Sequence, residues 1–245
     1  MNKHLIKTLL LLAPAWAFAA GGGVHLEKAN IDPDNVQSLQ RGAKMFVNYC
    51  LSCHSAELMR YERVGKDLGI EDKLVQEHLM FTGGKLGDLM TVATADADSK
   101  EWFGTVPPDL TVIARSRGAD WLYTYMKSFY RDDSKIIGVN NLVFPDVGMP
   151  HVLWELQGWQ DAVITTVKDS HGKESKSVAL ELTEPGIMSP KEYDRAVRDL
   201  VNFLDYMGEP YKHERKSLGV KVIMFLLVFL IVAYMMKREF WKDIH

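Results

Sequence analysis

The segment that decides the fold is NYCLSCHS, residues 48–55. It contains both cysteines of the 245-residue chain, Cys50 and Cys53, and His54 follows directly after the second one. Two thiols at this spacing reach the two vinyl groups on one edge of a porphyrin, and a histidine in the next position lies under the ring. The motif predicts one covalently attached haem c, with thioethers from Cys50 and Cys53 and with His54 as the proximal iron ligand.

Two other uses of a cysteine pair fit this sequence less well. A structural zinc site needs further ligands, and the chain has no second cysteine pair to supply them. A thioredoxin-like dithiol is expected within a βαβ pattern, which does not surround the motif, and it leaves His54 unexplained. Haem attachment is therefore the favoured interpretation of the motif.

The sixth position of the iron decides between electron transfer and ligand binding, because a methionine sulfur closes the site and raises the reduction potential. The chain has 12 methionines, so a choice is needed. Met149 lies in FPDVGMP, residues 144–150, where glycine and prolines favour an extended loop that aims a side chain inward. Met188 lies in a similar segment, and His151 is close to Met149 in the chain. These residues alone leave all three as candidates.

Residues 1–20 have the pattern of a secretory signal peptide, with a basic start, a short apolar stretch and small residues at the spacing of a cleavage site. We expect cleavage near Ala19 or Ala20. The apolar stretch is shorter than the roughly 20 residues that a membrane-spanning helix needs. The sequence therefore predicts that the rest of the chain is exported.

Residues 218–236 are almost continuously apolar and long enough to cross a bilayer. Basic residues flank this stretch on both sides, so charge alone does not orient it. Export through a cleaved leader does orient it. We expect a periplasmic haem domain over residues 21–217, one transmembrane anchor over 218–236 and a short cytoplasmic tail over 237–245.

The exported segment is predicted to be mainly helical, with long loops and a small β-hairpin. The apolar spacing and the capping residues predict four elements: a helix from Asp34 or Asn35 to about Tyr49, a helix over 118–130, a hairpin over 159–182, and a helix from Ser189 that ends before Gly208. The remainder is expected to be loop, above all between 83 and 150, where glycine and proline recur. So much irregular chain needs something to pack against, and a large apolar cofactor would serve.

Composition excludes some classes of protein. About half of the residues are apolar (47%) and a quarter are charged (25%), which is ordinary for a globular protein. The formal net charge is -3, and this mild acidity argues against nucleic-acid binding.

Several ordered blocks together resemble one family, cytochrome c1, the haem subunit of the ubiquinol–cytochrome c reductase (cytochrome bc1) complex. The resemblance covers essentially the whole exported chain and the anchor. The blocks are CLSCHS (50–55) with Leu58, Arg60 and Tyr61, GKL (84–86), PPDLT (107–111) with Ile113, Arg115 and Arg117, DVGMP (146–150), and the last helix leading through Glu209 and Pro210 into the span.

The resemblance implies roles for further residues. The methionine of the Gly-Met-Pro loop is the axial ligand, which is Met149 here, with His54 on the other side of the iron. Arg117 matches a position near a haem propionate, and Pro108 with Pro107 walls the haem edge. The family has apolar or proline residues where this chain has His151.

The fold implied is a class I c-type cytochrome core. In it, the N-terminal helix, with Gly42 and Phe46, crosses the C-terminal helix at Leu200 and Leu204. The small Gly42 would allow the two backbones to approach closely.

The function implied is one-electron transfer from a Rieske iron–sulfur protein to a soluble or membrane-tethered cytochrome c. The chain would act as the electron-transfer subunit of ubiquinol–cytochrome c reductase in a respiratory chain, with no independent catalytic activity. Its expected partners are cytochrome b and the Rieske subunit in a dimeric complex, together with membrane lipid. The expected location is the bacterial inner membrane, single-pass, with the haem domain in the periplasm. The alternative is a free-standing, membrane-anchored cytochrome c that feeds a terminal oxidase.

Overall fold

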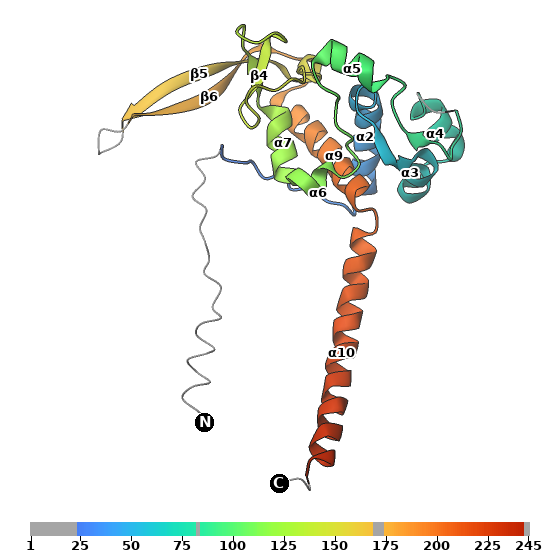
Figure 1. The fold of residues 1–245 in the computed structure, drawn as a ribbon. Coiled ribbons are helices and arrows are strands. Elements are labelled where there is room, and N and C mark those ends of the chain that lie inside the picture. The colour runs from blue at the N-terminus through green and yellow to red at the C-terminus, as the bar shows by residue number, and fades with distance from the viewer. Residues whose placement is uncertain (1–23, 82–83, 169–173, 243–245) are drawn as a thin grey trace.

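The structure, a computed structural model, describes residues 24–81, 84–168 and 174–242. A helical head carries a long two-stranded ribbon on one side and a single long helix below (Figure 1). In chain order the elements are α2 (Val36–Met45), the π-helix η1 (Phe46–Cys50), β1 (Ala56–Arg60), α3 (Tyr61–Leu68), α4 (Asp72–His78), β2 (Leu89–Met90), α5 (Asp96–Phe103), α6 (Ile113–Arg117), α7 (Ala119–Lys127), β3 (Phe129–Arg131), β4 (Val139–Asn141), α8 (Trp154–Gln157), β5 (Gly158–Lys168), β6 (Glu174–Pro185), α9 (Pro190–Gly208) and α10 (Lys212–Phe240).

The centre of the head is the crossing of α2 and α9. A side-chain carbon built on Gly42 would lie 2.1 Å from the carbonyl oxygen of Asp199, so only glycine allows this approach. One turn further along the chain, at the start of η1, the ring of Phe46 packs on Phe203 with 5.6 Å between centroids. The expected crossing at Gly42 and Phe46 is confirmed, and its partners on α9 include Asp199 and Phe203 besides the buried Leu200 and Leu204.

Both helices begin as their capping residues predict. The side-chain oxygen of Asn35 accepts a hydrogen bond from the amide of Ser38 at 3.0 Å, which caps α2. At the start of α9, Ser189 and Glu192 form a capping box, with Pro190 in the first turn. The apolar face of α9 is buried, with Tyr193, Val197, Leu200, Val201, Leu204 and Met207, whereas Val36 in the first turn of α2 is exposed.

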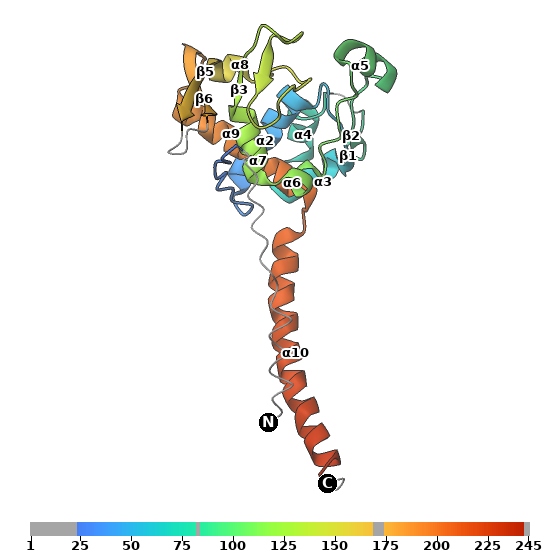
Figure 2. The same ribbon diagram turned by 60° about the vertical axis from the view of Figure 1, so that its left-hand side comes forward.

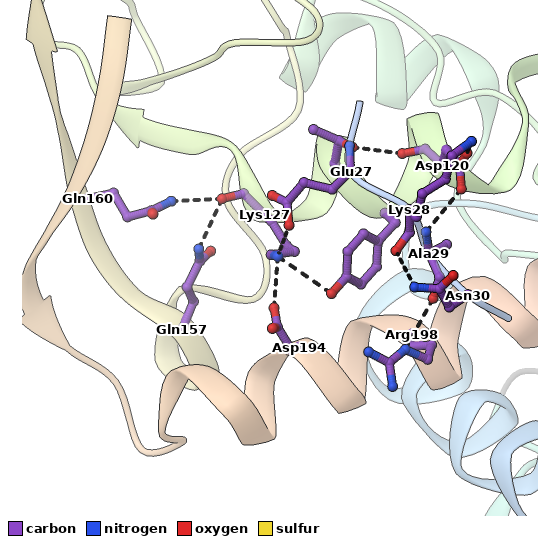
Figure 3. A network of polar contacts seen from close by, with 12 residues as sticks. Glu27, Lys28, Ala29, Asn30, Asp120, Lys127, Gln157, Gln160, Asp194 and Arg198 are labelled. Carbon is purple, nitrogen blue, oxygen red and sulfur yellow. Dashed lines mark hydrogen bonds and ion pairs between the residues drawn. The ribbon is translucent and has the colours of Figure 1, made fainter. Parts of the chain in front are cut away.

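The N-terminal segment before α2 lies against α7 and α9. The ammonium of Lys127, at the end of α7, donates to Glu27 at 2.5 Å and to Asp194 on α9 at 2.8 Å (Figure 3). Burial would lower the pKa of Lys127, but the hydrogen bonds to Asp194 and Glu27 outweigh it and raise the pKa. Next along the segment, Ala29 donates its amide to Asp120 at 2.9 Å. These contacts fix α7, one wall of the site described below.

The long loop expected between 83 and 150 is only partly correct. Within its described residues, it contains α5, α6 and three short strands besides the predicted helix α7, and two more helices, α3 and α4, lie before it. These helices have five to nine residues, too few turns for a clear apolar period, and several are stopped by glycine. Gly69, for example, ends α3 in the left-handed conformation (φ 63°). The helix expected over 118–130 ends at Lys127, and residues 129–131 form β3 instead.

The predicted hairpin is confirmed as the antiparallel pair β5 and β6, which pair from Gly158 and Pro185 to Lys168 and Glu174 with one register shift between Trp159 and Gln160. It extends sideways from the head as a two-stranded ribbon (Figure 1). Its root is tied to β3 by Arg131, which contacts Asp161 at 2.7 Å and Glu184 at 2.6 Å. The expected turn at 169–173 lies outside the described residues.

The last helix, α10, leaves the head as a separate rod (Figure 2). Its segment from Glu214 to Phe240 is long and apolar enough to cross a membrane, and none of it is buried against the head. This stretch is therefore not a core helix of the head. The predicted signal peptide, residues 1–20, lies outside the described residues, as do the last three residues of the predicted tail, 237–245. The architecture is mainly helical with small antiparallel hairpins, as predicted.

Candidate haem site

A largely apolar cavity of about 350 Å³ opens in the head between the end of η1, the segment 103–110, α7 and the loop 144–150. All six residues that the sequence singled out border it: Cys50, Cys53, His54, Pro108, Arg117 and Met149. They come from four separate segments, which only the tertiary fold brings together. Of the two rival ligands, neither Met188 nor His151 lines the cavity.

The cysteine side of the cavity is formed by one turn of chain. The helix widens before Cys50, where the amide of Leu51 donates to the carbonyl of Phe46, five residues back, at 3.0 Å. The amides of Cys53 and His54 then both donate to the carbonyl of Cys50, at 3.1 and 2.8 Å. Single π-turns of this kind are frequent at functional sites. The tight turn directs both thiols and the imidazole toward one cavity.

The imidazole of His54 is held in one tautomer. Its Nδ1 lies 2.8 Å from the carbonyl oxygen of Pro108, which can only accept, so Nδ1 carries the proton and donates. The other nitrogen, Nε2, is then left with a free lone pair for a metal. Burial lowers the pKa of His54 and outweighs the Pro108 hydrogen bond and the charge of Asp109, which both act to raise it. The lowered pKa keeps the ring neutral. A neutral imidazole with an oriented Nδ1–H is the form that binds iron.

The sulfur of Met149 borders the same cavity. The hydroxyl of Tyr125 donates to it at 3.4 Å, and burial raises the pKa of Tyr125, so the hydroxyl keeps its proton. Tyr125 stacks on Trp121 one turn earlier in α7, with 5.0 Å between ring centroids. These two aromatic residues were not singled out from the sequence, although their spacing of four on a predicted helix places them on one face.

The loop that carries Met149 is pinned by buried amides at its start. The side-chain oxygen of Asn141, which is fully buried, accepts from the hydroxyl of Ser128 and from the amides of Val143 and Phe144. The side-chain nitrogen of Asn141, Nδ2, donates to the carbonyl of Tyr125 at 2.8 Å. This network links the loop to the end of α7, and no pattern in the sequence pointed to it.

Arg117 lies at the mouth of the cavity. Its guanidinium lies over the ring of Trp121, 5.1 Å from the centroid, and near that of Phe144, at 5.9 Å. Both rings also line the cavity. The aromatic faces hold the cation in place by cation–π attraction, which leaves its donor groups available to an anionic substituent of a bound group.

His151 points away from the cavity. It is only 5% exposed, and its ring stacks on Phe129 with 5.0 Å between centroids and 5° between planes. Burial lowers its pKa to about 4. The structure therefore does not place His151 in the same cavity as His54, and Met149 is the candidate ligand opposite His54.

The cavity fits haem c in its donors and its lining. It offers two thiols, an oriented imidazole and a thioether, set in a largely apolar wall that includes Leu110, Leu122 and Leu204. The size lies within the range of small-molecule sites. Burial raises the pKa of the Cys50 thiol to about 12, so Cys50 is not a thiolate at neutral pH, contrary to what a thiol–disulfide enzyme needs. The dithiol interpretation is thereby weakened.

This chain is similar in sequence to several known proteins. The model of the Cytochrome C1 family matches residues 185–244. Cytochrome c1 of Allochromatium vinosum is 53% identical to this chain, with 100% of both chains covered. A Nitrosomonas europaea protein named ammonia monooxygenase gamma subunit is 49% identical over 99% of this chain and 100% of its own length. Cytochrome b/c1 of Bradyrhizobium diazoefficiens is 24% identical over 85% of this chain and 33% of its own length.

Proposed function

Because this chain belongs to the cytochrome c1 family, we propose that it carries single electrons from a Rieske iron–sulfur protein to a cytochrome c. The family supplies the haem-containing, membrane-anchored electron-transfer subunit of the cytochrome bc1 complex and binds haem c covalently. The chain has no catalytic activity of its own in this proposal. It sets the potential and the position of one redox centre within a quinol-oxidising complex of a respiratory chain.

Four residues of the cavity hold the haem in this proposal. Cys50 and Cys53 would form the two thioethers, and His54 would bind the iron through Nε2 while its Nδ1–H donates a hydrogen bond to the carbonyl of Pro108. Met149 would be the second iron ligand and would raise the potential, as methionine ligation does in c-type cytochromes. Bound haem c supplies a one-electron iron couple. The observation that carries the proposal is that this turn of chain and the sulfur of Met149 border one apolar cavity.

Two further residues take supporting roles. Arg117, held over Trp121 at the mouth of the cavity, pairs with a haem propionate. Pro108 covers the haem edge and also fixes His54 through its carbonyl. The position of both side chains in the wall of the cavity supports these roles.

The chain is arranged across a bacterial inner membrane in this proposal. Residues 1–20 act as the signal peptide, 21–217 form the periplasmic haem domain, 218–236 cross the bilayer among its lipids, and 237–245 remain in the cytoplasm. The separation of α10 from the head supports this arrangement. Cytochrome b and the Rieske protein are the partners within the complex, which is dimeric, and a soluble or membrane-tethered cytochrome c is the acceptor.

Mass spectrometry tests the attachment. The peptide spanning Asn48 to Ser55, from the mature full-length protein, is expected to carry the mass of one haem. The reduced-minus-oxidised spectrum of the same sample is expected to be that of a c-type cytochrome. An unmodified peptide with two free thiols would contradict the proposal and favour a thiol enzyme.

Isolation of the intact complex tests the partners. Full-length protein purified from membranes in mild detergent is expected to bring cytochrome b and the Rieske protein with it. On addition of a quinol, reduction of its haem is expected to stop when the Rieske cluster is removed, whereas cytochrome b is still reduced. Purification with a terminal oxidase instead, without cytochrome b, would identify a free-standing cytochrome c.

A further inference from the structure

We infer that His151 is a positioning residue for Met149, and that its flat stacking in an aromatic cleft keeps the sulfur turned toward the cavity. The inference rests on the proposed role of Met149 as an iron ligand. His151 does not line the cavity, so it acts through the backbone of the loop and not by contact with the bound group.

The ring of His151 is held on two sides. One face lies flat on Phe129, at 5.0 Å and 5°, and Trp159 meets it edge-on at 5.9 Å and 78°. The backbone is held as well: the carbonyl of His151 accepts a hydrogen bond at 3.2 Å from the amide of Trp154, the first residue of α8. The side chain and the backbone of this residue are therefore both anchored.

The fixed position of His151 restricts the backbone of Met149, because only Pro150 lies between the two residues in the chain. The ring of a proline fixes its own φ angle, and it also restricts the residue before it to extended conformations. With 151 fixed, few backbone rotations are left that would carry the sulfur of Met149 out of the cavity.

The same stack also holds the partner of the sulfur. Phe129 meets the ring of Tyr125 edge-on at 5.1 Å, and the hydroxyl of Tyr125 donates to the sulfur of Met149 at 3.4 Å. Met149, His151, Phe129 and Tyr125 are thus connected to one another in a closed series of contacts. Removal of the His151 side chain breaks this series next to the loop that carries Met149.

The ring of His151 is held mainly by its flat faces. Within the described part of the chain, its Nε2 is buried without a hydrogen-bond partner, although hydrogen bonding to Gln157 and to the backbone of Gly158 partly offsets the effect of burial on its pKa. Because one of its polar atoms stays unpaired, hydrogen bonding fixes the ring less completely than stacking on Phe129 does. A phenylalanine at this position is then expected to replace the histidine, whereas an alanine is not.

The test measures carbon monoxide binding to the reduced, full-length holoprotein. Apparent affinity for carbon monoxide scales with the fraction of molecules whose sixth position is open. We expect His151→Ala to raise this affinity about tenfold or more and to lower the midpoint potential, and His151→Phe to stay within about twofold of the wild type. Unchanged binding in His151→Ala, or an increase in His151→Phe as large as in His151→Ala, would overturn the inference.

Trp154→Ala is the matched control. It removes a ring that stacks on Trp159 at 5.6 Å but is exposed on its other face, so it weakens the same cluster without touching the ligand loop. Carbon monoxide binding is expected to remain at the wild-type level. An increase equal to that of His151→Ala would show that any loss of packing in the cluster has this effect, and it would overturn the inference. If His151→Ala does not accumulate, His151→Leu replaces it, with the same two outcomes relative to His151→Phe.

Met149→Ala separates the two proposals. It is expected to open the sixth position fully, with tighter carbon monoxide binding than in any His151 variant. If it leaves binding at the wild-type level, the ligand assignment of Met149 fails and this inference fails with it. If Met149→Ala opens the site and His151→Ala does not, only the inference about His151 fails.

Discussion

On one side of the cavity, Cys50, Cys53 and His54 come from a single turn of chain, whereas on the other side Met149 depends on contacts from α7, β3 and the root of the hairpin. The first arrangement is covalent once haem is attached and is set by neighbours in sequence. The second is held by weak contacts between distant segments. The covalent attachment of haem and the position of Met149 therefore depend on different contacts, and each can be lost without the other. The following experiments separate the two.

The largest effect is expected on the cysteine side. In a variant with both Cys50→Ala and Cys53→Ala, no thioether can form, so all covalently bound haem is expected to be lost. Haem-dependent peroxidase staining after denaturing electrophoresis measures this loss. Ser52→Ala, between the two cysteines, is the control and should stain normally, because Ser52 is exposed and its hydroxyl makes only a long contact of 3.8 Å to the sulfur of Cys53. A stained band in the double variant would mean attachment elsewhere.

The next effect concerns the helix crossing that supports this turn. Gly42→Ala places a methyl group 2.1 Å from the carbonyl of Asp199, so α2 must move away from α9. We expect the free energy of unfolding to fall by about 3 kcal/mol, as overpacking in a core does. Denaturant titration measures it, with Gly87→Ala as the control, since a side-chain carbon there meets nothing within 4 Å. Equal losses in both variants would contradict the close crossing.

On the methionine side, Asn141→Ala removes the amide that pins the ligand loop. The amides of Val143 and Phe144 then lose their partner, and the carbonyl of Tyr125 loses one of its hydrogen bonds but keeps that from the amide of Ser128. Stability is expected to fall by about 2–3 kcal/mol, because buried groups are left without hydrogen bonds. The holoprotein should also bind carbon monoxide more tightly. Asn48→Ala, which removes one exposed hydrogen bond to Lys44, is the comparison, and it should change neither quantity.

A smaller effect is expected from Tyr125→Phe. The hydroxyl of Tyr125 withdraws electron density from the sulfur of Met149, and without it the sulfur donates more strongly to the oxidised iron. A neutral hydrogen bond contributes about 1 kcal/mol, which for one electron corresponds to a fall of about 40 mV in the midpoint potential. Redox titration measures the shift. Tyr123→Phe, on the same helix but outside the cavity wall, should give none, and equal shifts would disprove the contact.

The smallest effect concerns the root of the hairpin. The hydrogen bond from Arg131 lowers the pKa of Asp161 to about 2. Because the unfolded chain binds this proton at about pH 3.9, the carboxylate stabilises the fold above that pH and loses its effect as the pH falls through about 2. The stability difference between wild type and Asp161→Asn should therefore shrink from about pH 5 downward in denaturant titrations. A stability difference that does not change with pH would show that the ion pair between Arg131 and Asp161 does not stabilise the fold.

Several features of this protein were predictable from the sequence because they depend on residues close together in the chain. The capping box at Ser189 and Glu192, the alternation along β5 and β6, and the apolar span within α10 are all patterns of this kind. Short helices such as α3 and α6 escaped prediction, because one or two turns do not establish a period. The crossing at Gly42 followed only from the family resemblance.

The sequence by itself determined the haem motif at Cys50, Cys53 and His54, since two thiols and an imidazole within five residues need only one turn of chain to converge. Only the tertiary structure separates Met149 from Met188 and His151 by position, because Met149 lines the cavity and the other two do not. The contacts that hold these positions, Tyr125 to Met149 and Phe129 to His151, join residues more than 20 positions apart. Separations of that length are set by packing in three dimensions, which no local pattern of residues encodes.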